Sequence, residues 1–258
     1  MTTAETAFRY LHWYVDVPTV GTRILSGGVP IADTADTDST VNTACVALEE
    51  KRGAWGAGDF LSISPLDGRL CRRPASWQGA GRAAKAPISQ NLHRVRTGPL
   101  LAVRSLYRDE AATEALDAGR FLTLRTHLGK AGFYITRGRT GAASTSDFSR
   151  IANRRVMDRA CQIARAAGVE LIGDTVAVND NGTITEKAAQ KIEAGINKQL
   201  TEALVDSGHA SNSNVTVSRT ANVLSTSTLP VTVRVTPLGS TDFIEYDIGF
   251  TSPSAAAA

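Results

Sequence analysis

Two different periods of apolar residues run through the last third of the chain. Between residues 183 and 206 the apolar positions fall four apart, which predicts a helix with one buried face. Its start is expected at Thr183 and Glu186, whose spacing suits reciprocal capping, and its end at Ser207-Gly208. The apolar stripe consists of Ile192, Ile196, Leu200 and Leu204.

The period then changes to two, which predicts three strands over residues 215–219, 229–236 and 244–250. The break at Pro237-Leu238-Gly239 predicts that the last two strands form an antiparallel hairpin. One helix over such a sheet makes a small α+β unit whose edges must be paired or covered. We expect this sheet to be a platform between subunits, with its apolar positions at Val215, Val217, Val231, Val233, Val235, Ile244, Tyr246 and Ile248.

The first half of the chain alternates shorter apolar runs with helical patterns. Strands are predicted over residues 8–20, 59–64, 121–126 and 132–136, and helices over 40–52 and 110–119. Loops are predicted over residues 26–39, 72–87 and 137–146. The predicted fold class is therefore α+β. An N-terminal α/β layer (residues 1–146) precedes a helix-plus-antiparallel-sheet unit (residues 147–258), which opens with a helix over residues 147–167.

Composition places the chain among ordinary globular proteins. Its 258 residues suffice for one or two cores, and 28 basic against 25 acidic residues give a net charge of only +3. The three cysteines (Cys45, Cys71 and Cys161) form no Cys-x-x-Cys pair, which argues against a disulfide framework or a zinc site. Neither a signal peptide nor an apolar run of membrane-spanning length is visible. We therefore expect that the protein does not insert into a membrane and that it is assembled in a cytosol.

Candidate catalytic chemistry is sparse. The four histidines lack a second histidine at metal-ligand spacing, and no nucleophile elbow is visible. Gly79-Ala80-Gly81 with Lys85 does not match a phosphate-binding loop. The sequence therefore predicts no catalytic, cofactor-binding or metal-ligating residues, and a protein that is not an enzyme.

Two groups of basic residues leave alternatives open. Arg154, Arg155 and Arg159 lie close together on the helix predicted over 147–167 and form either a solvated face or a positive row offered to a partner. A second group makes the middle of the chain basic. A solvated or protein-facing surface is favoured, because no aromatic residues are interleaved for binding a single strand, and a nucleic-acid-associated or capsid-like virion protein is the alternative function. The members of this second group are Arg72, Arg73, Arg82, Lys85, Arg94 and Arg96.

Four runs of sequence resemble the C-terminal part of contractile tail sheath proteins of bacteriophages and related contractile injection systems. They are FLTLRT…GFYITRGRT (121–140), NRRVMDRACQIAR (153–165), NDNGTITEKAAQKIEAGI (179–196) and NVLSTSTLPVTVRVTPLGSTDFIEYDIGF (222–250). The resemblance covers about residues 97–250 and lies in the order of elements, not in catalytic residues.

The resemblance implies a structural subunit. Such a subunit polymerises helically around a tail tube, exchanges strands with neighbouring copies, and contracts to drive the tube through a cell envelope. The implied partners are further copies of the chain, a tail tube protein, and baseplate and tail terminator proteins, with no direct nucleic acid. The implied location is the virion tail or an injection particle, assembled in the bacterial cytoplasm. In this setting Arg154, Arg155 or Arg159 is expected to face the tube.

Overall fold

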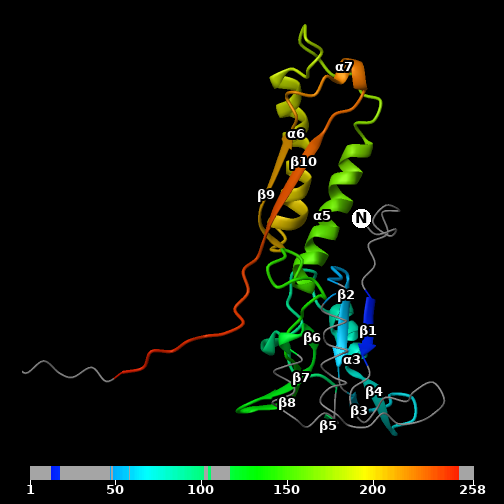
Figure 1. Cartoon of the computed structure of the whole chain (residues 1–258), viewed down its shortest axis with the longest axis vertical. Helices are drawn as coiled ribbons and strands as arrows, with labels where there is room; N and C mark the ends of the chain where they lie inside the picture. Colours follow the sequence, from blue (N-terminus) through cyan, green and yellow to red (C-terminus); the bar gives the residue numbers. More distant parts are fainter. Residues whose placement is uncertain are drawn as a thin grey trace, which may run out of the picture.

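The computed structural model describes residues 13–17, 47, 49–57, 59–101, 104–105 and 117–249. These residues form two stacked parts of an elongated molecule (Figure 1). The predicted loop at 26–39, most residues of the helices predicted at 40–52 and 110–119, and the last residues of the chain lie outside the described residues. Glu49 to Arg52, which are described, are not helical.

A parallel sheet lies at the centre of the first part. It has the order β1 (Trp13–Val17), β2 (Gly53–Ala57) and β6 (Phe121–Leu122), and helix α3 (Ala75–Lys85) packs on it. The close approach of helix and strand requires a glycine, because a Cβ on Gly56 would lie 2.6 Å from the backbone nitrogen of Ser76. This arrangement is the predicted α/β layer.

The prediction of a loop over residues 72–87 is wrong. Residues 70–74 form β4 (Leu70–Pro74), which pairs antiparallel with β3 (Asp59–Ile63), and α3 follows at once. The residues of α3 that face the sheet are small, among them Ala75, Gly79 and Ala83. A helix that buries small residues shows no aliphatic stripe, so its period was not visible in the sequence.

Short antiparallel pairs complete this part. Strand β5 (Arg104–Ser105) joins the other edge of β3, and the 3₁₀ turn η1 (Val95–Thr97) lies between α3 and β5. The strands predicted over 121–126 and 132–136 are confirmed as β6, β7 (Leu124–His127) and β8 (Lys130–Ile135), the last two forming a hairpin. The segment after it is not uniformly exposed as predicted, because Thr140 and Ala142 are buried.

The second part holds two long helices and one hairpin of strands. The elements are α5 (Ile151–Val169), α6 (Glu186–Leu200), which continues as a π-helical turn η2 (Thr201–Val205), β9 (Ala210–Val217), α7 (Val223–Thr226) and β10 (Val231–Pro237). The predicted apolar stripe is confirmed, since Ile196, Leu200 and Leu204 are buried and Ile192 packs beside them. The mixed α+β class is thereby confirmed.

The start of α6 differs from the predicted capping pair. The N-cap is Thr185, and its side chain makes no capping hydrogen bond. The Thr183 side chain instead donates a hydrogen bond to Asn181, and Glu186 accepts one from Arg219, which follows β9 in the chain. A tertiary partner has therefore replaced the local one that the spacing suggested.

A buried ion network connects the two parts. Arg52, just before β2, donates two hydrogen bonds of 2.7 and 2.8 Å to the carboxylate of Asp158 on α5. Arg154 lies 3.3 Å from the same carboxylate and stacks over the ring of Phe148. The side chains of Arg52 and Asp158 are 1% and 8% exposed, so the parts are joined by charges that are largely withdrawn from water.

Candidate inter-subunit interface

The sheet of β9 and β10 is covered on one face. Val215 and Val217 of β9 are buried against α6, while Val233 and Val235 of β10 are half-buried against the same core. In the described part of the chain this sheet has two strands, and each of them is an edge.

The outer edge of β10 is open. Ser218 donates a backbone hydrogen bond of 2.9 Å to Pro230, which fixes the parity of the β9–β10 ladder. Val231, Val233 and Val235 therefore turn their backbone N–H and C=O groups away from β9. Among the described residues none bonds to these groups, so they are available to a further strand.

The outer edge of β9 is closed at its C-terminal end. Val217 donates its N–H to the Glu193 carboxylate at 2.7 Å, and Arg219 donates to the Val217 carbonyl at 2.7 Å. Arg219 also forms ion pairs with Glu193 and Glu186. Its hydrogen bonds lower the pKa of both carboxyls and raise the pKa of Arg219. Side chains thus occupy the groups that a strand on this side would need.

Residues 238–249, here named the C-terminal arm, follow β10 and extend away from the body of the molecule (Figure 1). The prediction that residues 244–250 form a strand paired with β10 of the same chain is wrong for the described residues 244–249, which have no strand partner. Ile244, Tyr246 and Ile248 are 65%, 75% and 86% exposed. Their apolar alternation is real, but this chain does not bury it.

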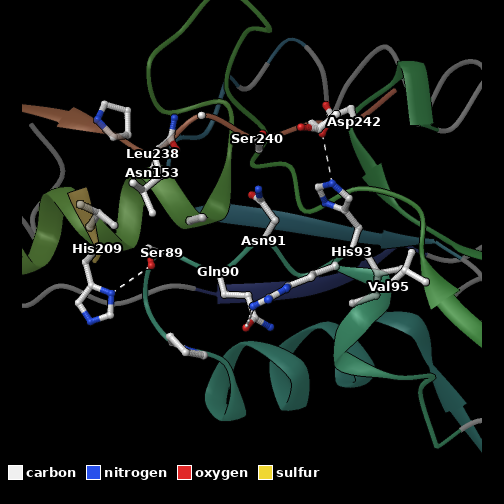
Figure 2. A pocket seen from close by; sticks show the side chains of 18 of the residues that line it. Ser89, Gln90, Asn91, His93, Val95, Asn153, His209, Leu238, Ser240 and Asp242 are labelled. Atoms are coloured by element: carbon white, nitrogen blue, oxygen red, sulfur yellow. Dashed lines mark hydrogen bonds and ion pairs between the residues drawn. The ribbon is translucent and has the colours of Figure 1, made fainter. Parts of the chain in front are cut away.

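The root of the arm is held on the first part of the molecule, which explains why the arm does not fold back on β10. Asp242 accepts two hydrogen bonds from Arg150, of 2.7 and 2.9 Å. Figure 2 shows its carboxylate facing the ring of His93, whose Nε2 lies 3.2 Å away. Phe243 lies under the guanidinium of Arg137, 4.8 Å from the ring centroid. These contacts are called the arm anchor below.

The electrostatics of the arm anchor favour an ionised Asp242. Burial by itself raises the pKa of Asp242, but the hydrogen bonds and the charge of Arg150 hold it below its ordinary value. Burial lowers the pKa of His93, and the neighbouring carboxylate only partly offsets this effect. Asp242 also supplies the negative charge that the start of α5 lacks, because no acidic residue occupies the first turn of that helix.

A groove of about 770 Å³ runs under the first residues of the arm. Its lining comes from the loop after α3, the hairpin β7–β8, the start of α5 and the turn after η2 (Figure 2). Polar and apolar side chains both line its walls, and Ser89 bonds to His209 across one end. Residues 238–242 of the arm themselves form one side of the groove.

The three candidate arginines on α5 do not share one environment. Arg154 is buried in the ion network with Asp158, so the expectation that it faces outward is wrong. Arg155 is half-buried and donates to the carbonyls of Ala86 and Pro87. Arg159 is exposed and bonds to Gln162. Arg154 lies one helical turn before Asp158 on the same face of α5, so the Asp158 carboxylate balances its buried charge.

Two of the central basic residues have partners within the chain. Arg82 donates to the carbonyls of Arg94 and Gly98, and Arg73 stacks over Trp77. Both side chains are therefore held by contacts within the chain, whereas Arg72, Lys85, Arg94 and Arg96 are exposed. Within the described ranges no group of three or more His, Cys, Asp or Glu could hold a metal ion. None of the helices described is long and apolar enough to cross a membrane.

The arm anchor was not found from the sequence. Asp242 and Arg150 are 92 positions apart, and His93 belongs to a third segment. A single acidic residue in Ser-Thr-Asp-Phe carries no periodic signal, so only the fold brings these charges together. The same is true of Arg219, whose two glutamate partners lie a full element away.

Two family models match consecutive parts of this chain. The N-terminal domain of DUF2586 matches residues 32–139, and the C-terminal domain of DUF2586 matches residues 147–255. Together the two models span most of the sequence. The chain belongs to the DUF2586 family. No curated protein matches this DUF2586 sequence closely enough to count as a relative.

Solved structures of contractile injection systems have the same fold as this DUF2586 chain. A chain of the anti-feeding prophage baseplate aligns with a TM-score of 0.62 at 13% identity, over 95% of this chain and 62% of that one. A chain of the PVC sheath complex in the contracted state aligns with a TM-score of 0.65 at 12% identity, over 92% and 63%. The helical sheath of the anti-feeding prophage in the contracted state gives 0.59 at 12%, over 94% and 62%.

These likenesses establish the fold. The DUF2586 chain has the fold of contractile tail sheath proteins, which confirms the resemblance seen in the sequence. It spans a little under two thirds of the length of the chains that it matches.

Proposed function

We propose that this DUF2586 protein is a structural subunit of a contractile tail sheath. It polymerises helically around a tail tube and contracts to drive the tube through a cell envelope. Its partners are further copies of itself, a tail tube protein, and baseplate and tail terminator proteins. It works in a virion tail or injection particle that is assembled in the bacterial cytoplasm. The fold shared with sheath chains supports this role.

The observation that carries the proposal is an unpaired strand edge together with an unpaired strand sequence. The edge of β10 offers the backbone groups of Val231, Val233 and Val235, and the arm offers Ile244 and Ile248 without a place to bury them. The anchor at Asp242 holds the arm off its own sheet. An arm donated to the β10 edge of a second copy would pair these backbone groups and bury these apolar side chains at the same time.

Charge complementarity supports the same pairing. If Ile244, Tyr246 and Ile248 of the donated arm lie on the helix-covered face, then Glu245 and Asp247 lie on the opposite face. Arg234 of β10 is exposed on that opposite face. Opposite charges on neighbouring strands favour pairing, whereas the blocked end of β9 offers no such match.

Polymerisation through donated strands explains how a lattice could change shape without coming apart. The strand pairs can stay fixed while the segment between the arm anchor and the donated strand bends. A head-to-tail contact of this kind does not close on itself and produces a helical filament. Arg159, the exposed one of the three candidate arginines, remains the candidate contact to the tube, through weak and salt-screened charge interactions.

The test blocks the open edge without touching the subunit's own ladder. Val233→Pro removes an N–H that points away from β9, and edge strands tolerate proline at such positions. Val233→Ile is the matched control because it keeps the donor. We expect tubes in electron micrographs of the wild type and of V233I, and folded but unassembled subunits for V233P. Tubes of V233P that match those of the wild type would contradict the proposal, as would normal tubes after deletion of the residues following Phe243.

A further inference from the structure

Four arginines converge on a small pocket beside the arm anchor. Arg120 follows the helical turn before β6, Arg137 and Arg139 follow β8, and Arg150 precedes α5. The backbones of Arg139 and Arg150 form a β-bridge, which sets the two residues side by side. The pocket has a volume of about 130 Å³, and the hydroxyl residues Ser144 and Ser149 also line it.

Among the described residues only two carboxylates form ion pairs with these four arginines. Arg150 pairs with Asp242, and Arg137 pairs with Asp117 at 3.2 Å. Arg120 donates to the carbonyl of Gly141 at 2.8 Å, and Arg139 donates to the carbonyl of Asp117 at 3.3 Å. Those carbonyls are neutral, so the described part of the pocket keeps an excess of positive charge.

Two further observations indicate that keeping this excess of positive charge in the pocket costs free energy. Burial lowers the pKa of the Arg139 guanidinium, and the charge of Arg137 lowers it further. Arg120 has a φ of 70°, in the left-handed region that residues with a side chain of this size seldom adopt. Unfavourable backbone geometry of this kind persists where surrounding structure enforces it, and such positions cluster at ligand sites.

We propose that this pocket binds one small oxyanion, a phosphate or a carboxylate, between Arg120 and Arg139, next to the resident carboxylate of Asp242. Planar guanidinium groups from two segments can each give two parallel hydrogen bonds to such an anion. The volume suits a group of this size and excludes a nucleotide. The anion comes either from solution or from an acidic side chain of a second copy, and the second source alone rests on the proposed function.

The test for a soluble anion uses the whole chain and inorganic phosphate. We expect calorimetric titration to show saturable binding to one site that chloride at equal ionic strength does not give. Arg139→Gln and Arg120→Gln should each lower the affinity at least about tenfold, because each loses a charge-assisted hydrogen bond. Arg139→Lys, which keeps the charge without the fork, should lie in between. Arg96→Gln, at an exposed arginine outside the pocket, should bind like the wild type.

Assembly distinguishes the second source. If phosphate does not bind, but folded R120Q and R139Q subunits assemble more weakly than R96Q, the anion is a carboxylate of a neighbouring copy. Binding of phosphate supports the inference whether or not tubes form, so its outcome is independent of the sheath proposal. The inference is overturned if phosphate binds no better than chloride and neither pocket variant differs from R96Q in assembly.

Discussion

The buried ion network between the two parts of the subunit allows a quantitative prediction. Asp158→Asn keeps the shape of the side chain but removes the charge that Arg52 meets through bonds of 2.7 and 2.8 Å and that Arg154 meets at 3.3 Å. Removing one partner from a buried pair costs about 3–5 kcal/mol, because the remaining charge stays buried without compensation. For a subunit with a urea slope of about 3 kcal/mol/M, the midpoint should fall by about 1–2 M.

The measurement is urea unfolding of the unassembled subunit, followed by two probes. Tryptophan fluorescence reports the first part, since Trp55 and Trp77 belong to it, and far-ultraviolet circular dichroism also reports the long helices α5 and α6. Both transitions should shift together, because Arg52 and Asp158 belong to different parts.

The control is an exposed pair of the same kind of charges. Lys198 and Glu202 lie 3.9 Å apart on neighbouring turns, with side chains 75% and 61% exposed, so Glu202→Gln should cost no more than about 0.5 kcal/mol. A loss below about 1 kcal/mol for D158N would refute the reasoning that this network joins the parts.

Two further predictions concern pH and packing. Burial lowers the pKa of His93 below its ordinary 6.5, so as the pH falls the unfolded chain binds a proton before the folded chain does, and the free energy of unfolding should decrease below about pH 6.5. In urea titrations between pH 7 and 5, H93Q should show a flatter dependence of stability on pH than the wild type. Equal slopes for the two proteins would count against this prediction. In thermal unfolding, Gly56→Ala should destabilise the protein by about 1–3 kcal/mol, because its Cβ would meet the Ser76 backbone. Gly81→Ala, which has open space around it in α3, should stabilise the protein by roughly 0.5–1 kcal/mol. Equal effects of the two substitutions would contradict the close approach of α3 to β2.

Periodic elements with a continuous apolar face were predictable from the sequence. The stripe from Ile192 to Leu204 and the alternation in β10 survive in the structure because local pattern and tertiary burial agree there. Helix α3 was missed because its buried face is built from Ala75, Gly79 and Ala83, which do not stand out as apolar.

The residues that decide the arrangement of the arm could not be predicted in the same way. The alternation at Ile244, Tyr246 and Ile248 indicates a strand but not which chain supplies its partner. The contacts of Asp242 with Arg150 and His93 decide that it is not β10 of the same subunit, and they join three distant segments. The division of the chain at residue 146 and the contact of α5 with a tube stay predictions.

Cross-linking tests strand donation most directly. In a chain whose own three cysteines are replaced by serine, Arg234→Cys is combined with a cysteine at each arm position from 244 to 248, one at a time. Donation of the arm to the β10 edge of a second copy predicts a ladder of covalent multimers with cysteine at 245 or 247, on the face of Arg234, and little with cysteine at 244, 246 or 248. Monomers at every position, or cross-links confined within one chain, would contradict the account.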